Sequence, residues 1–200
     1  MNLADRFTLL RIILAPAFFI LYMLPLWFPA QFDGSAIWLV PLLWVVAVVS
    51  EFTDMFDGMA ARRLKQASDF GRLFDPFADT LMQLTGFLCF VVEGLFPAIF
   101  FLVVLYREFG ILFLRNLMLA KGITMGARKS GKVKTVAYIS AETIALFYIS
   151  LKRLAVMDNV QPIARIAAAA AFIISVLISV ISFFDYFMVY KRAGAVTEKK

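Results

Sequence analysis

The stretch that decides the fold reads DMFDGMAARRLKQASDFGRLFDPFAD and runs from Asp54 to Asp79. Four carboxylates, those of Asp54, Asp57, Asp75 and Asp79, stand here at the ends of two apolar segments. Burying a charge in a membrane interior is costly unless something compensates it. A bound cation is the compensation that this pattern indicates.

Helical spacing places these aspartates in two pairs. Asp54 and Asp57 are at positions i and i+3 of a helix that we predict over residues 37–64. Asp75 and Asp79 are at positions i and i+4 of the next predicted helix. Within each pair, both carboxylates therefore share one face of their helix.

The connection between the two pairs is predicted at residues 65–74, with Pro76 in the first turn of the following helix, where proline is favoured. Folding the two helices back across this loop brings the four carboxylates together. Hard oxygen ligands suit Mg²⁺ or Mn²⁺, and two such ions about 3.5 to 4 Å apart are usual in phosphoryl chemistry. The chain has no His, and its one Cys, Cys89, lies in an apolar run, which argues against zinc.

Small and basic residues in the same stretch suit a phosphate ligand. Gly58 and Ala61 leave room beside the carboxylates, and Gly71 allows a turn or a close approach of a ligand to the backbone. Arg62 offers a planar pair of donors to a phosphate oxygen. The competing interpretation is structural: the acids cap helix ends and pair with neighbouring arginines.

The complete pattern is D-x2-D-G-x2-A-R-x8-G-x3-D-x3-D, with eight fixed positions filled. It resembles the signature of the CDP-alcohol phosphatidyltransferases, membrane enzymes that move a phosphatidyl group from a CDP-linked lipid to an alcohol. The resemblance implies that Asp54, Asp57 and Asp75 hold the metals, and that Asp79 completes the second metal site or acts as the general base. The residues implied in binding the CDP moiety are Asp54, Gly58, Ala61, Arg62 and Gly71.

Composition independently indicates a membrane protein. Apolar residues make up 62% and charged residues 17% of the chain, and the mean hydropathy is +0.86. A soluble domain is usually about half apolar and a quarter charged. The net charge of +6 comes from basic residues that cluster beside apolar runs, where they face anionic headgroups, so nucleic-acid binding is a poor explanation.

The chain is expected to form one domain over residues 1–200, an all-α integral membrane bundle of six transmembrane helices. The apolar spans are predicted at residues 7–29, 37–64, 76–94, 98–120, 135–151 and 163–190. An even number of spans puts both termini on one side of the membrane. The basic residues collect on that side, which predicts cytoplasmic termini and an active site open to the cytoplasm.

A second group of charges lies in and after the span at 98–120. Arg107 and Arg115 share one face of it, and charges at that depth should face the bundle interior. The loop predicted at 121–134 adds Lys132 and Lys134, which completes an anion pocket suited to a phosphorylated acceptor. Two alternatives stay open: the arginines pair with Glu108 or Glu142, or the loop is a general headgroup-binding patch.

Three further motifs resemble those of one branch of the family, the bacterial phosphatidylglycerophosphate synthases. These are Arg107-Glu108 followed by Arg115, the G-K-x-K-T motif at 131–135, and an N-x5-T-x2-R opening formed by Asn2, Thr8 and Arg11. Thr80 departs from that branch, which often has Lys after the last Asp. The resemblance implies a homodimer in the bacterial cytoplasmic membrane, among membrane lipids. CDP-diacylglycerol and glycerol 3-phosphate would give phosphatidylglycerol phosphate and CMP. The residues implied in binding the acceptor phosphate are Arg11, Arg107, Arg115, Lys132 and Lys134.

Other functions remain as alternatives. The same chemistry could use inositol phosphate, and a neutral alcohol or serine fits the basic loop less well. A divalent-cation carrier would place its acids near the middle of the membrane, often in broken helices. A purely structural membrane protein has no need of the aspartate spacing.

Overall fold

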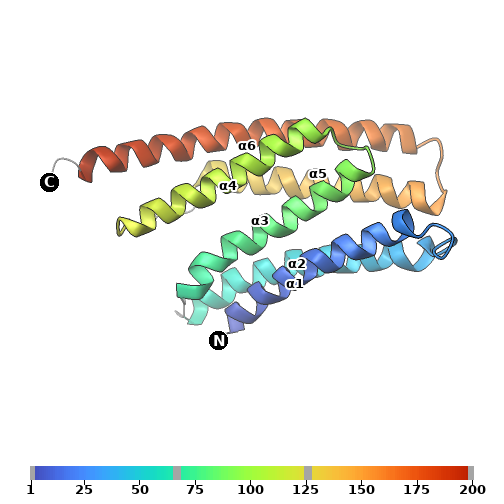
Figure 1. Cartoon of the computed structure of the whole chain (residues 1–200), viewed down its shortest axis with the longest axis horizontal. Coiled ribbons are helices and arrows are strands. Elements are labelled where there is room, and N and C mark those ends of the chain that lie inside the picture. Colours follow the sequence, from blue (N-terminus) through green and yellow to red (C-terminus); the bar gives the residue numbers. More distant parts are fainter. Residues whose placement is uncertain (1–2, 65–68, 124–127, 198–200) are drawn as a thin grey trace.

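The computed structural model describes residues 3–64, 69–123 and 128–197, with side chains over 6–53, 74–123 and 128–192. This part of the chain is helical and contains no strand, which confirms the predicted all-α class. Its six helices are α1 (Leu3–Trp27), α2 (Ala36–Leu64), α3 (Asp69–Val92), α4 (Ala98–Ala120), α5 (Lys129–Leu154) and α6 (Gln161–Thr197) (Figure 1).

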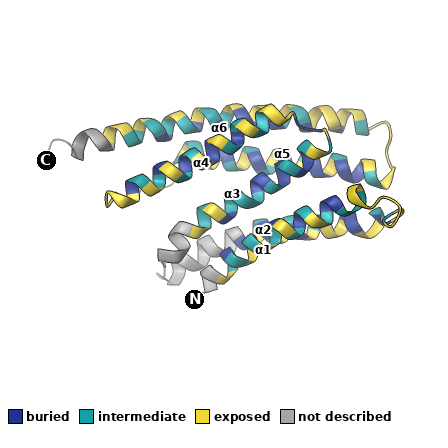
Figure 2. Cartoon of the chain, in the orientation of Figure 1, coloured by how far each residue is buried: buried dark blue, intermediate teal, exposed yellow. Residues whose placement is uncertain are grey.

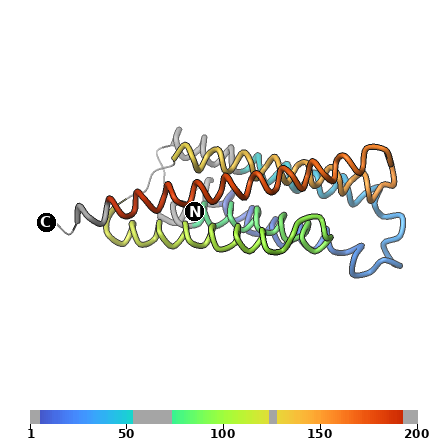
Figure 3. The backbone as a smooth tube through the Cα atoms, turned by 90° about the horizontal axis from the view of Figure 1, so that it is seen from above, coloured from blue at the N-terminus to red at the C-terminus, as the bar shows by residue number. Residues whose placement is uncertain are grey.

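The helices run alternately up and down one bundle. Both ends of the chain lie at one end of it, which we call the terminal end (Figure 1). The α1–α2, α3–α4 and α5–α6 connections lie at the opposite end, which we call the hairpin end. Seen from above, the axes of the helices lie roughly along the long axis of the bundle, although the chain direction alternates (Figure 3). α5 packs along α6, α1 lies against α2 and α3, and α4 lies against α6.

Three helical segments of the described chain are long and apolar enough to cross a membrane: Arg6–Trp27, Ala36–Thr53 and Gln161–Arg192. α4 is outside this group because it carries Arg107, Glu108 and Arg115. Charges are tolerated in a membrane helix when they face the bundle interior, and Arg107 and Glu108 are 7% and 4% exposed. The structure is that of a helical membrane protein, and six spans stay a prediction.

Exposed residues occur along all six helices (Figure 2). Many of them are large and apolar, so apolar side chains lie on the outside of the bundle as well as in its interior. Ile166, Leu177 and Ile181 on α6 are examples, each at least 60% exposed. A water-soluble monomer rarely exposes contiguous apolar surface on this scale, whereas lipid hydrocarbon accommodates it.

Aromatic rings from three helices and a connection fill the core. Phe87 of α3 contacts Tyr138 of α5 and Phe172 of α6 edge-on, at centroid separations of 5.1 and 5.0 Å. Phe96, in the α3–α4 connection, stacks on Phe172 at 3.9 Å. Because these rings join distant parts of the chain, they fix α3, α5 and α6 relative to one another around the charged residues described below.

The predicted start of the third helix is wrong. α3 begins at Asp69, so most of the loop predicted at 65–74 is helical, and Pro76 lies inside the helix instead of in its first turn. An interior proline removes one backbone hydrogen bond, and packing of α3 against α1 offsets that loss. Asp75 and Asp79 consequently sit well within α3.

The predicted start of the fifth helix is also wrong. α5 begins at Lys129, so Lys132 and Lys134 belong to a helix and not to the loop predicted at 121–134. Gly131 disfavours a helix locally, but a Cβ at this position would lie 2.8 Å from Tyr186 Oη. Close packing of α5 on α6 therefore requires a glycine here and stabilises the extra turns.

Candidate active site

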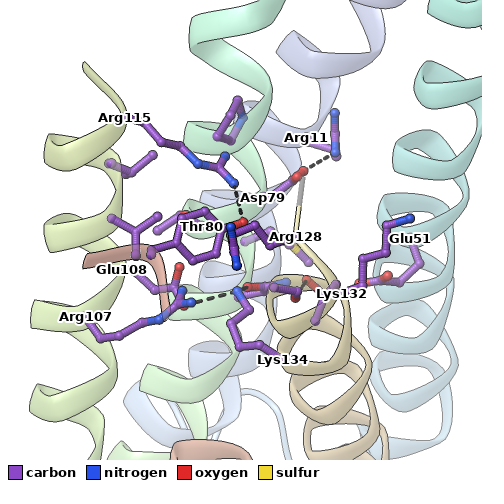
Figure 4. A pocket seen from close by; sticks show the side chains of 18 of the residues that line it. Arg11, Glu51, Asp79, Thr80, Arg107, Glu108, Arg115, Arg128, Lys132 and Lys134 are labelled. Carbon is purple, nitrogen blue, oxygen red and sulfur yellow. Dashed lines mark hydrogen bonds and ion pairs between the residues drawn. The ribbon is translucent and has the colours of Figure 1, made fainter. Parts of the chain in front are cut away.

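A cavity of about 200 Å³ lies between the helices toward the terminal end and receives side chains from all six of them (Figure 4). Its charged lining residues are Arg11, Glu51, Asp79, Arg107, Glu108, Arg115, Arg128, Lys132 and Lys134. Cations outnumber anions in this set, so the cavity favours a negatively charged ligand. All five residues predicted to bind the acceptor phosphate line this one cavity.

Arg11 of α1 is held against the aspartates of α3. Its Nη1 donates a hydrogen bond to Asp79 Oδ1, and its Nη2 lies 3.7 Å from Asp75 Oδ1. Thr8 Oγ1 also donates to Asp75 Oδ1. Arg11 is 1% exposed, so this buried guanidinium holds the two carboxylates beside each other, and Arg11 and Asp79 line the cavity.

These two carboxylates fit the predicted cation site. Asp75 and Asp79 are one helical turn apart on α3 and converge on the same positive group, Arg11. Carboxylate oxygens are the ligands that Mg²⁺ and Mn²⁺ prefer. The described side chains include no group of three or more metal-ligating residues. Asp54 and Asp57 lie outside the described side chains, so the four-carboxylate site stays a prediction.

The residues predicted to contact the CDP moiety fall in the same part of the sequence. Gly58, Ala61, Arg62 and Gly71 lie outside the residues whose side chains the structure describes. Their role in CDP binding stays a prediction.

Glu108 of α4 accepts hydrogen bonds from two of the predicted phosphate ligands. Its Oε1 accepts hydrogen bonds from Arg107 Nη1 at 2.7 Å and from Lys134 Nζ at 3.1 Å. Lys134 Nζ also donates to Gln83 Oε1 of α3 at 3.1 Å. All four of these side chains are buried. The predicted pairing of Arg107 with Glu108 is therefore present, and it extends to Lys134.

Arg107 is further fixed to α6. Its Nε donates to the backbone carbonyl of Ser179 at 3.1 Å, and its Nη2 donates to Ser182 Oγ at 3.0 Å. With the Glu108 bond, these contacts hold all three guanidinium nitrogens. Arg107 is thus a structural link between α4 and α6 as well as a cavity-lining cation.

Arg115 has fewer hydrogen-bond partners than Arg107 among the described residues. Its Nη2 donates to Tyr186 Oη at 3.3 Å, and its guanidinium lies over the Tyr186 ring, 5.5 Å from the centroid. Its Nε is buried without a hydrogen-bond partner among the described residues. A buried donor in that state is costly, so Arg115 has hydrogen-bonding capacity for a ligand in the cavity.

Arg128, just before α5, is held by hydrogen bonds to a residue of α6. Its Nε and Nη2 donate to the two oxygens of Asp185 at 2.6 and 2.8 Å, and Ser130 Oγ donates to Asp185 Oδ2 at 2.6 Å. Hydrogen bonding to Asp185 raises the pKa of the Arg128 guanidinium above its ordinary value. The pair holds a permanently charged Arg128 at the edge of the cavity.

Among the described residues, two cavity cations have no carboxylate partner: Arg115 and Lys132. The other four are paired, Arg11 with Asp75 and Asp79, Arg107 and Lys134 with Glu108, and Arg128 with Asp185. Unpaired cations in a shared cavity offer charge to an anion without first breaking an existing ion pair. The structure thereby separates the five predicted phosphate ligands into two kinds.

Sequence reasoning did not assign roles to several residues of this cavity. Asp185 and Tyr186 lie in the last apolar span, more than 50 residues from their partners Arg128 and Arg115. Asp185 could have been found, because a carboxylate inside an apolar span is expected to have a partner. Gln83 carries no comparable signal, since neutral polar residues are common in such helices.

Comparison with known proteins agrees with the aspartate signature. A family model described as CDP-alcohol phosphatidyltransferase matches residues 1–185. Among curated proteins, the CDP-diacylglycerol–glycerol-3-phosphate 3-phosphatidyltransferase of Treponema pallidum is 36% identical over 192 residues, which cover 93% of this chain and 88% of that protein.

Two further relatives carry related names. The Bacillus subtilis CDP-diacylglycerol–glycerol-3-phosphate 3-phosphatidyltransferase is 32% identical over 149 residues, covering 74% of this chain and 77% of its own. The probable phosphatidylglycerophosphate synthase of Mycobacterium tuberculosis is 29% identical over 185 residues, covering 92% and 79%. Because the aspartate signature is intact and the family model matches residues 1–185 of this chain, the chain belongs to the CDP-alcohol phosphatidyltransferase family.

Proposed function

We propose that this protein transfers a phosphatidyl group from CDP-diacylglycerol to glycerol 3-phosphate, giving phosphatidylglycerol phosphate and CMP. Its family and the names of its relatives support this reaction. The structural observation that carries the choice of acceptor is the pair of cations in the cavity, Arg115 and Lys132, that lack carboxylate partners among the described residues.

The acceptor phosphate would bind between Arg115 of α4 and Lys132 of α5. An arginine fork positions a phosphate as well as attracting it, because it offers two parallel donors. Arg11, Arg107 and Lys134 remain in the proposed pocket, where they contribute charge while held by their carboxylates. A neutral acceptor would leave the excess cations of this cavity uncompensated.

Asp79 would act on the acceptor hydroxyl. It lines the same cavity as the proposed phosphate ligands and is fixed by Arg11. A carboxylate so placed can accept the proton of the attacking hydroxyl or hold that hydroxyl in line. The two roles predict the same loss of activity when Asp79 is removed.

Mg²⁺ or Mn²⁺ would be held by Asp54, Asp57, Asp75 and Asp79. Two such ions would neutralise the diphosphate and stabilise the charge that develops on the departing CMP. Arg62, Gly58, Ala61 and Gly71 would contact the CDP moiety, as the family signature implies. Arg11, already in contact with both described aspartates, would keep their oxygens turned toward the site.

Placement in the membrane follows from the distribution of charge. The starts of α1 and α5 lie toward the terminal end, and the end of α5 lies toward the hairpin end (Figure 1). The exposed Arg6 and Lys129 belong to those two starts, whereas Lys152 and Arg153 belong to the last turn of α5. Positive residues favour the cytoplasmic side. We therefore propose six spans in a bacterial cytoplasmic membrane, with termini and cavity on the cytoplasmic side, and a homodimer as the family implies.

The test is CMP release by purified protein in detergent, supplied with CDP-diacylglycerol, Mg²⁺ or Mn²⁺, and one acceptor in each tube. The acceptors are glycerol 3-phosphate, inositol phosphate, serine and none. Asp79→Ala and Asp57→Ala serve as inactive variants, and chelator serves as the metal control. We expect release with glycerol 3-phosphate that is lost in both variants and in chelator.

Each other outcome has a definite meaning. Release with inositol phosphate or serine instead would keep the chemistry and change the acceptor. Absence of release with every acceptor, from protein that unfolds cooperatively, would reject the transferase proposal and favour a divalent-cation carrier. Uptake of Mn²⁺ into proteoliposomes would then be the measurement that decides.

A further inference from the structure

Glu108 presents one bonded and one unbonded oxygen in the cavity. Both hydrogen bonds that its carboxylate accepts, from Arg107 and Lys134, go to Oε1. Both hydrogen bonds found among the described side chains therefore leave Oε2 unused, and Glu108 lines the cavity. The buried Tyr138 hydroxyl, which has no hydrogen-bond partner among the described residues, lies next to the same carboxylate. A charged oxygen in that position is a ready acceptor for a hydroxyl donor of a ligand.

The position of Glu108 relative to the proposed phosphate ligands indicates which hydroxyl of a ligand can reach Oε2. Glu108 and Arg115 are seven residues apart on α4, two helical turns or about 10 Å along the axis, and both face the cavity. Asp79 belongs to a different helix, α3, and lines the same cavity. A small acceptor with its phosphate at Arg115 can extend its carbon chain toward both carboxylates.

We propose that Glu108 Oε2 accepts a hydrogen bond from the acceptor hydroxyl that is not transferred, and that it thereby selects a phosphorylated polyol over a phosphorylated mono-alcohol. This inference rests on the proposed function. Glycerol 3-phosphate has two hydroxyls: the attacking one is directed to Asp79 and the other meets Glu108. Glu108 is thus a specificity-determining residue, and its ion pairs with Arg107 and Lys134 hold Oε2 in place.

The charge on Glu108 makes such selection strong. Arg107 and Lys134 fix the carboxylate before the ligand arrives, so little ordering is lost on binding. Sites built to hydrogen-bond a substrate hydroxyl reject an analogue that lacks it, because the buried polar group is then left unpaired. Glu108 is 4% exposed, so water compensates poorly for a missing hydroxyl.

The experiment compares two acceptors in the same CMP-release assay: glycerol 3-phosphate and 3-hydroxypropyl phosphate, which lacks the second hydroxyl. We expect the unaltered protein to prefer glycerol 3-phosphate by at least about tenfold in kcat/KM, the size of one charge-assisted hydrogen bond. In Glu108→Gln and Glu108→Ala we expect this preference to shrink toward equality, because the glycerol 3-phosphate rate falls more than the other.

Two variants and one control keep the test decisive. Glu108→Ala leaves Arg107 and Lys134 without their partner, so Glu108→Gln, which keeps the shape, decides if the alanine variant does not fold. Asp158→Ala removes an exposed carboxylate in the α5–α6 connection and should leave the preference unchanged. Thermal unfolding of each variant in the same detergent checks the fold.

Several results would overturn the inference while leaving the proposed function intact. These are equal use of both acceptors by the unaltered protein, an unchanged preference in the Glu108 variants, or equal losses with both acceptors. Equal losses would assign Glu108 to holding Arg107 and Lys134 alone. Absence of CMP release with both acceptors from the unaltered protein would instead reject the proposed function, and this inference with it.

Discussion

Arg128 and Asp185 meet in a two-bond fork, with Arg128 Nε and Nη2 donating to Asp185 Oδ2 and Oδ1 at 2.6 and 2.8 Å. The fork joins the start of α5 to α6 across 57 residues of sequence. It fixes one cationic edge of the cavity without using any residue of the aspartate signature. Fork geometry of this kind gives position as well as attraction.

The first prediction concerns this fork. Asp185→Asn keeps the shape but removes the charge, so Arg128 loses its fixed position, and we expect a severalfold rise in KM for glycerol 3-phosphate. KM for CDP-diacylglycerol should stay unchanged, because neither residue is implied in CDP binding. Ser130→Ala, which removes the lesser donor to Asp185, is the matched control and should have a smaller effect. Equal changes in both KM values would contradict the prediction.

The second prediction separates the two kinds of cavity cation. Arg115→Met removes a cation without a carboxylate partner, so we expect a rise of about tenfold or more in KM for glycerol 3-phosphate with little loss of stability. Arg107→Met removes a guanidinium held at all three nitrogens, so we expect a clear fall in the unfolding temperature. Steady-state kinetics and thermal unfolding in detergent distinguish these outcomes. The opposite pattern would mean that Arg107 is the main phosphate ligand.

The third prediction concerns the contact between Gly131 and Tyr186. A Cβ at residue 131 would lie 2.8 Å from Tyr186 Oη, so Gly131→Ala forces the hydroxyl away from Arg115. We expect a lower unfolding temperature and a higher KM for glycerol 3-phosphate.

Adding Tyr186→Phe to Gly131→Ala tests the cause of those effects. The nearest ring carbons are 3.5 and 3.6 Å from the added Cβ, an ordinary contact distance, so the stability should recover. The KM should stay high, because the hydroxyl that positions Arg115 is gone. Recovery of neither property would place the cause elsewhere in the α5–α6 contact.

The fourth prediction is a dependence of stability on pH at the hairpin end. Glu93 accepts hydrogen bonds from Tyr22 Oη at 2.6 Å and from Lys152 and Arg153, each at 3.1 Å. Burial of Glu93 acts to raise the pKa of its carboxyl, but the hydrogen bond from Tyr22, the charge of Arg153 and the hydrogen bond from Lys152 outweigh it. The pKa of Glu93 therefore lies below its ordinary value of 4.5.

A lowered pKa in the folded state fixes the sign of the effect. The contribution of Glu93 to stability is fully present above about pH 4.5 and is lost as the pH falls through the folded-state pKa. Glu93→Gln should lower the unfolding temperature at neutral pH. On acidification, the unfolding temperature of this variant should fall by less than that of the unaltered protein. Asp33→Asn, an exposed change at the same end, is the control. Parallel acid profiles for the Glu93 variant and the unaltered protein would contradict this account.

The fifth prediction is a metal effect with a readout other than activity. Mg²⁺ or Mn²⁺ should raise the unfolding temperature of the substrate-free protein, because a ligand that binds the folded state stabilises it. Asp79→Asn and Asp75→Asn should each reduce that rise, whereas Asp158→Asn should not. An identical rise in all variants would show that the cation acts elsewhere.

The amino-acid sequence was enough to predict the family and the helical class, and both predictions are confirmed. The metal chemistry of the aspartate stretch stays a prediction. The signature is local, since its spacing follows the helical repeat and needs no knowledge of distant packing. The helix predicted at 98–120 was found at those residues, because Pro97 precedes it and Gly122 follows it with the positive φ that residues just beyond a helix end favour. The prediction that five basic residues share one anion pocket also rested on local patterns.

Tertiary structure alone decided which of those basic residues are paired. Whether Lys134 meets Glu108, or Arg128 meets Asp185, depends on how α4, α5 and α6 lie against one another. The same packing extended α5 back to Lys129, which local preference around Gly131 would not predict. Ion pairs between distant helices have no periodic signature in a sequence, because their geometry exists only after the helices have packed.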